Sequence, residues 1–207
     1  MSETLTSPPP SLDASPLKPN ETNEVFIAPY WMGNGSPFPE STIPYLFART
    51  KEDGLLRRIF PGAQELNLPQ FIEKVSHWPM VLGFSKDNNE LMAYSFLSEY
   101  ANPSPYRKAN IGFCFFKKFW GRPETRDLAR LALDWFFHKE GVAVLYGTIR
   151  VWNRTAVQFS RELYFNEIGR LPMFFYTEQG LEDVILTVLT RDEFVHNMGS
   201  RYGGRNV

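Results

Sequence analysis

The sequence is short of the residues from which disulfide frameworks and metal sites are built. Its 207 residues include one cysteine, Cys114, and three histidines, His77, His138 and His196. A single cysteine excludes an intrachain disulfide, and the widely separated histidines lack the spacing of metal ligands. We therefore expect no bound metal, a reducing compartment such as the cytoplasm, and a buried structural role for Cys114 among its aromatic neighbours.

Long apolar runs and an excess of one charge are also absent. No stretch approaches the roughly 18 apolar residues of a membrane-spanning helix, and the polar, proline-rich start is unlike a secretory signal. The formal net charge of −1 argues against a globally basic nucleic-acid-binding protein. The motifs GxxxxGK[ST], GxSxG, HExxH and CxxC do not occur, so nothing local supports a hydrolase or a metalloenzyme.

Proline and aromatic residues are plentiful. Aromatic residues make up 15% of the chain and hydrophobic residues 43%, enough to build a substantial core. Residues 1–44 are rich in proline, serine and threonine, so we expect an extended or disordered arm that can bind a protein partner. We expect residues 45–190 to form one domain and residues 191–207 to form a flexible tail.

Hydrophobic patterns in the central region predict a mixed sheet flanked by helices. The clearest helix is 124–139, because Leu128, Leu131 and Ala132 follow helical spacing. The remaining predicted elements, in chain order, are helices at 41–49 and 69–75, a hairpin of strands at 80–85 and 91–97, a strand at 111–116, a strand at 142–149, a helix at 153–164, and strands at 165–176 and 183–190. This order indicates an α/β or α+β fold.

Positive charge is concentrated in one third of the chain. Between Arg107 and Arg161 there are 11 lysines and arginines against four acids. Within it, a strand, a basic turn and an amphipathic helix follow one another, and a helix N-terminus offers unpaired N–H groups to an anion. A phosphate-bearing ligand and plain surface solvation of these charges are about equally compatible with this pattern. Nucleic-acid binding is the least favoured reading.

A second segment, residues 153–170, carries a recognisable pattern. It has an asparagine, a small residue three positions later, an apolar helical face, and then a strand that contains Gly-Arg; the matching residues are Asn153, Ala156, Phe159, Leu163, Phe165, Gly169 and Arg170. From about residue 80 to 189 the chain resembles the GNAT superfamily (GCN5-related N-acyltransferases), in particular the group that modifies ribosomal-protein N-termini. The resemblance implies a mostly antiparallel sheet and acyl transfer to an amine, borne by a small molecule, a protein N-terminus or a lysine.

The resemblance also implies acetyl-CoA as the acyl donor, held by the strand at 111–116 and the turn that follows it. The implied donor-binding residues are Phe115, Phe116, Lys117, Lys118, Gly121, Arg122, Arg126 and Asn153. The chain departs from the family pattern at Pro123, which occupies a glycine position and has no N–H, and at Trp120, where a basic or polar residue is usual.

For catalysis, the resemblance implies a base and a proton donor. No acid lies on the matching strand, and the candidate base is Glu99 at the end of the preceding hairpin, while Ser160 stands at the usual tyrosine position and Tyr164 lies one turn later. These departures keep a second hypothesis open. The chain can instead be a non-catalytic GNAT-fold interaction protein, such as an assembly or virion component of a tailed phage, which would bind partners through residues 1–44.

Overall fold

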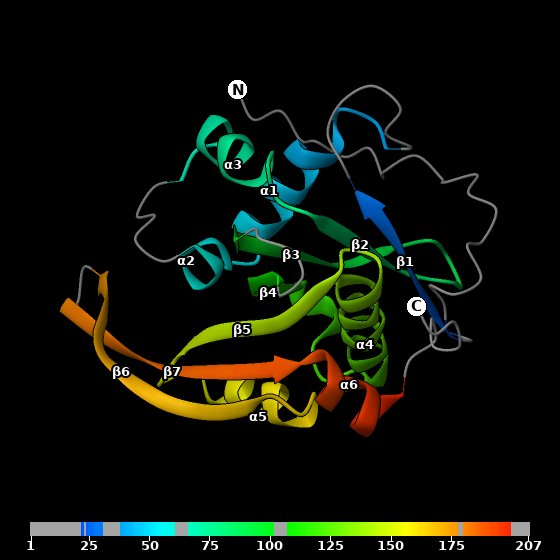
Figure 1. The fold of residues 1–207 in the computed structure, drawn as a ribbon. Helices are drawn as coiled ribbons and strands as arrows, with labels where there is room; N and C mark the ends of the chain where they lie inside the picture. The colour runs from blue at the N-terminus through cyan, green and yellow to red at the C-terminus, as the bar shows by residue number, and fades with distance from the viewer. Residues whose placement is uncertain are drawn as a thin grey trace.

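A seven-stranded sheet organises the chain (Figure 1). The computed structural model describes residues 22, 24–30, 38–60, 66–101, 107–177 and 180–199. The strand order is β1-β2-β3-β4-β5-β7-β6, and within the described strands every neighbouring pair except β4–β5 is antiparallel. This confirms the predicted mixed, mostly antiparallel sheet. The strands are β1 Val25–Tyr30, β2 Met80–Ser85, β3 Leu91–Ala101, β4 Arg107–Phe115, β5 Val142–Arg150, β6 Asn166–Thr177 and β7 Gly180–Thr190.

Helices cover the sheet on both sides. The helices are α1 Thr42–Glu52, α2 Leu56–Ile59, α3 Leu68–Val75, α4 Pro123–His138, α5 Arg154–Glu162 and α6 Arg191–Met198, with a short 3-10 turn at Lys117–Phe119. In Figure 1, α4 and α6 lie on the viewer's side of the sheet, and α1, α2 and α3 group together at the upper left. Within the described residues, no helix is both long and apolar enough to cross a bilayer.

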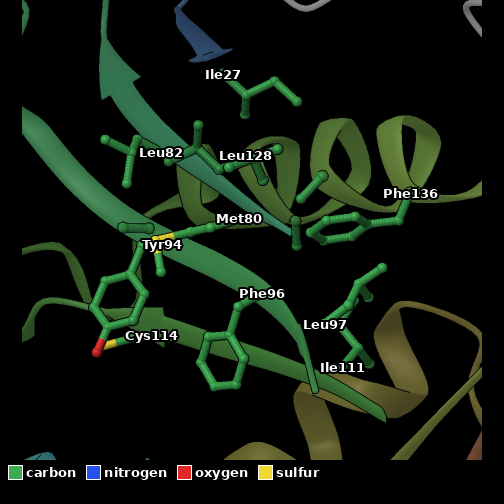
Figure 2. Close-up of a cluster of buried hydrophobic side chains, with 14 of the residues drawn as sticks. Ile27, Met80, Leu82, Tyr94, Phe96, Leu97, Ile111, Cys114, Leu128 and Phe136 are labelled. Carbon is green, nitrogen blue, oxygen red and sulfur yellow. The ribbon is translucent and has the colours of Figure 1, made fainter. Parts of the chain in front are cut away.

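A large part of the core lies between α4 and the first strands. Figure 2 shows Leu128 and Phe136 of α4 directed toward the strands that carry Ile27, Leu82 and Leu97, and all five side chains are buried. The helix approaches β2 closely, because a Cβ built on Gly83 would lie 2.8 Å from the Leu128 side chain. The helical spacing that predicted α4 therefore marks the face that the core buries.

Two predicted boundaries differ from the structure. Strand β1 lies inside the range 1–44 that was expected to be an arm, and it forms an edge of the sheet with Val25 and Ile27 buried. Pro29 is compatible with this position because an edge strand tolerates a missing N–H. Residues 1–21, 23 and 31–37 of the predicted arm lie outside the described residues.

Helix α6 lies in the range 191–207 that was expected to be a flexible tail. The helix begins with a capping box, in which Thr190 and Glu193 each accept a backbone N–H of the other residue, and Phe194 is 1% exposed. Capping and one buried aromatic side chain therefore attach this segment to the domain. Residues 200–207 lie outside the described residues.

Candidate functional site

The sheet opens at the one parallel pair. Strands β4 and β5 are paired from Arg107 to Asn110 and from Val142 to Tyr146, and no pairing between them continues beyond these residues. Strand β4 remains paired with β3, and β5 with β7, so each keeps one bonded edge. The two facing edges therefore present backbone N–H and C=O groups to the space between them. An extended ligand with amide groups can pair with edges of this kind.

A cavity of about 650 Å³ occupies this opening. Its inner walls are the diverging ends of β4 and β5 and one face of α5, and its outer walls come from α2, α3 and the ends of β3 and β6. Three aromatic rings form one outer wall: Trp78 stacks on Phe96 at 4.7 Å and on Phe60 at 5.9 Å between centroids. The cavity is thus an apolar slot through the sheet with an aromatic rim.

Glu99 lines the cavity, as a base for an amine substrate would have to do. The residue lies where the β3–β4 register shifts, between Ser98 and Ala101, and it has a φ of 51°. A bulge of this kind redirects a side chain out of the regular alternation of a strand. The Tyr146 hydroxyl donates a hydrogen bond of 2.6 Å to Glu99 Oε2. Burial, followed by the Glu99 hydrogen bond and charge, raises the pKa of Tyr146 to about 12, so this tyrosine stays a donor near neutral pH.

Two other predicted residues line the cavity and already have local hydrogen bonds. Asn153 caps α5, because its side-chain oxygen accepts the Ala156 N–H at 3.3 Å. The Ser160 hydroxyl donates to the Val157 carbonyl at 2.8 Å. Tyr164 does not line the cavity; it has a φ of 63° and a side chain that is 44% exposed. The structure thus brings Glu99 and Ser160 to one cavity and leaves Tyr164 outside.

The basic turn lies mostly outside the cavity. Of the eight predicted donor-binding residues, Phe115, Gly121 and Asn153 line the cavity; Phe116, Lys117, Lys118, Arg122 and Arg126 do not. The reasons are contacts made with distant parts of the chain.

Acids from other elements pair with two of the expected cations. Lys118 Nζ lies 2.6 Å from Glu90 Oε1, and Arg126 Nε lies 2.8 Å from Glu162 Oε2. The Lys117 backbone N–H donates to Asp53 Oδ2 at 2.8 Å. Two of the four expected cations, Lys118 and Arg126, are therefore already paired with acids of the chain. Phe116, 1% exposed, belongs to the core.

Other polar groups of the turn make hydrogen bonds to residues close by in the sequence. Pro123 is the first residue of α4, the Arg122 N–H donates to Phe119 O at 3.3 Å, and the Trp120 indole donates to Phe115 O at 2.7 Å. Gly121, with a φ of 77° and no atom within 4 Å of a built Cβ, leaves open space at the cavity edge. The cavity is therefore open at this edge. Lys118 and Arg126, which were expected to bind the diphosphate, are held by Glu90 and Glu162.

Cys114 lines the same cavity but has the character of a structural thiol. Its side chain is 2% exposed, and burial raises its pKa to about 12. The thiol is therefore protonated near neutral pH, which removes it as a nucleophile. Among the described residues, no three His, Cys, Asp or Glu side chains are grouped as a metal site would require.

Comparison with solved structures identifies the fold of the chain, whereas comparison of sequences finds no match. No protein-family model matches the sequence, and no curated protein matches it. Among solved structures, the ribosomal-protein-S5-alanine acetyltransferase of Vibrio fischeri matches with a TM-score of 0.64 and 16% identity, over 84% of this chain and 97% of that one. The spermidine N-acetyltransferase of Vibrio cholerae, solved with CoA and spermine, matches with a TM-score of 0.65 and 18% identity, over 82% and 98%. The chain has the GNAT acetyltransferase fold.

The same fold appears in a putative acetyltransferase of Acinetobacter baylyi, with a TM-score of 0.63 and 12% identity, over 83% of this chain and 96% of that one. At these identities the likeness shows the GNAT fold alone. The opening between β4 and β5 and the aromatic rim are observed in the structure of this chain itself.

Sequence reasoning missed the outer half of the cavity. Arg58, Arg150 and Trp152 line it, and Tyr146 holds Glu99, yet none was among the predicted site residues. One signal was present: Trp120 and Trp152 each follow a buried strand by a few residues, at the two strand ends that diverge. Arg58 gave no signal, because it lies on a one-turn helix without hydrophobic periodicity.

Proposed function

We propose that the chain is an acyl-CoA-dependent N-acyltransferase, which transfers an acetyl group to an amine. The observation that carries this proposal is the divergence of β4 and β5 around a cavity that contains the Glu99 carboxylate. The GNAT fold supports the donor, because a solved structure with this fold is in complex with CoA and spermine.

The chain's own backbone would hold the donor. The open edge of β4 at 111–115 would pair with the amides of the pantetheine arm, and Gly121 and Asn153 border the same space. Acyl-CoA supplies the acetyl group as a thioester. Holding this arm in a fixed slot places the thioester beside the amine and lowers the entropic cost of their reaction.

Glu99 would act as the base. Its carboxylate accepts the proton that the amine loses as the new N–C bond forms; the C–S bond breaks, and CoA leaves as its thiolate, which takes up a proton from solvent. The hydrogen bond from Tyr146 fixes one carboxylate oxygen and so orients the other. The Ser160 hydroxyl donates its hydrogen to Val157, and its oxygen remains able to accept a hydrogen bond from water or substrate. Tyr164, outside the cavity, has no part in this reaction.

Calorimetry with two matched tryptophan variants tests donor binding. Ala156 lines the cavity and Gln158 is exposed on the same helix, so Ala156→Trp fills the slot whereas Gln158→Trp does not. We expect acetyl-CoA to bind the wild type and Gln158→Trp equally and Ala156→Trp at least about tenfold more weakly, a difference of roughly 1.4 kcal/mol. Equal binding by all three, or no binding at millimolar donor, would contradict the proposal.

Two observations favour the second hypothesis, that the chain is a non-catalytic interaction protein. Lys118 and Arg126 are paired with acids inside the chain, and Pro123 removes an N–H from the turn. An interaction protein with this fold would not bind acetyl-CoA in the experiment above. An association with phage particles has no support among the compared structures.

A further inference from the structure

The outer half of the cavity carries more positive than negative charge. The charged side chains that line the cavity are Arg58, Lys74, Arg150 and Glu99. Among the described residues, no carboxylate lies within 4 Å of the Arg58 or Lys74 cationic groups. A ligand that enters from this side therefore meets two cations that no acid of the described residues pairs with.

The third cation is already neutralised. Arg150 Nε lies 3.3 Å from Glu182 Oε2, although the geometry is not that of a hydrogen bond. The Trp152 indole donates to the same Glu182 oxygen at 3.1 Å, which fixes this acid behind the cavity wall. Glu182 thus balances Arg150, and the surplus charge of the outer wall belongs to Arg58 and Lys74.

Arg58 is placed across the mouth of the opening. Its guanidinium carbon lies 5.8 Å from the ring centroid of Trp120 and 5.6 Å from that of Trp152. These tryptophans follow β4 and β5, the two strands that diverge. A guanidinium stacked on aromatic rings keeps its N–H edge free for a planar anion, and a carboxylate can accept two of these N–H groups at once.

An apolar surface completes the arrangement. The stacked rings of Phe60, Trp78 and Phe96 line the same outer half as Arg58, and Glu99 lies in the same cavity. A cation, a carboxylate base and a flat apolar wall together match three groups of a ligand: an anion, an amine and an apolar side chain.

We infer that the acyl acceptor is a small amine that carries a carboxylate, of the α-amino-acid class with an apolar or aromatic side chain. The inference rests on the proposed function. The acceptor's carboxylate binds Arg58, its amine is directed to Glu99, and its side chain packs against the aromatic wall. A polyamine is disfavoured, because its charges would face Arg58 and Lys74 without a compensating acid.

The test compares an amino acid with its amide, which replaces the carboxylate, and with a polyamine. L-Phenylalanine, L-phenylalaninamide and spermidine are titrated by calorimetry into the full chain without donor, and are then compared as acceptors with acetyl-CoA. We expect phenylalanine to bind and to react with a kcat/KM at least about tenfold above that of the amide and of spermidine. The variant Arg58→Gln should abolish the preference over the amide, chiefly through KM, whereas Arg57→Gln, next to it on α2, should keep the preference.

Each outcome decides between the two claims. Equal binding of phenylalanine and its amide, or identical behaviour of Arg58→Gln and Arg57→Gln, would overturn the inference. Acetyl transfer to amines without preference for a carboxylate would overturn the inference and leave the proposed function standing. Carboxylate-dependent binding of phenylalanine without any transfer would overturn the proposed function and the acceptor role, and would leave Arg58 as a carboxylate-binding residue.

Discussion

Glu99 reaches the cavity because a bulge interrupts β3 at that residue. The proposed reaction needs its carboxylate as a base, so Glu99→Gln should lower kcat/KM for acetyl transfer by about 10²- to 10⁴-fold. Binding of acetyl-CoA, measured by calorimetry, should be unchanged. Glu167→Gln, on the exposed strand β6, is the matched control and should keep full activity. A Glu99→Gln variant with wild-type turnover would remove Glu99 from the mechanism.

The Tyr146 hydroxyl makes the stability of the folded chain depend on pH. Burial and Glu99 raise its pKa to about 12 in the folded chain, above the ordinary value of about 10 for tyrosine. The unfolded chain therefore loses this proton first as the pH rises, and the stability that the group contributes below pH 10 is lost between about pH 10 and 12.

Urea unfolding at pH 9, 10 and 11 measures this effect. The free energy of unfolding of the wild type should fall more steeply over this range than that of Tyr146→Phe, which cannot ionise. Tyr176→Phe, at a position that is 73% exposed, serves as the control and should follow the wild type. Parallel curves for Tyr146→Phe and the wild type would show that the hydrogen bond to Glu99 does not bias this proton.

At the scale of elements, the wall of the cavity depends on a close contact between β3 and β4. A Cβ built on Gly112 would overlap the Phe96 ring, whereas a Cβ built on Gly169 in β6 meets no atom within 4 Å. We expect Gly112→Ala to lower the free energy of unfolding by about 1–3 kcal/mol through overpacking. Gly169→Ala should change the free energy by no more than about 0.5 kcal/mol. Urea denaturation checks both, and equal effects would contradict the packing described for Phe96.

How far the sequence predicts this structure depends on where the stabilising contacts lie. Helix α4 and the β2–β3 hairpin were predicted correctly, because periodicity and turn residues are local signals. Strand β1 was missed because its partner, β2, lies more than 50 residues further along the chain. Helix α6 was missed because its sequence is mostly polar and lacks a hydrophobic periodicity. What holds it in place is its capping box and one buried side chain, Phe194.

The candidate site shows the same division. The family resemblance implied a site beside β4, and Glu99, Gly121 and Asn153 do line a cavity there. The ion pairs of Lys118 and Arg126 could not be predicted, because their partners Glu90 and Glu162 come from other elements. Charge counted along a sequence does not show which charges the fold neutralises.

At the scale of the whole molecule, the sheet consists of two parts. Strands β1–β4 form one part and β5–β7 the other, joined by the short parallel pairing that ends at Asn110 and Tyr146. The helices and turns at the diverging ends supply Arg58, Trp120 and Trp152 to the mouth of the opening. The site thus belongs to the junction of the two parts rather than to a single element.

The most direct test of the account is hydrogen–deuterium exchange of the full chain with and without acetyl-CoA. If the donor pairs with the open edge of β4, amides at 111–115 should exchange more slowly with acetyl-CoA, because N–H groups that face the opening gain partners. Amides of β1 and β2, far from the opening, should exchange at unchanged rates. Protection at 111–115 would support the strand opening as the donor site. Unchanged exchange there at saturating acetyl-CoA, or protection confined to other elements, would contradict it.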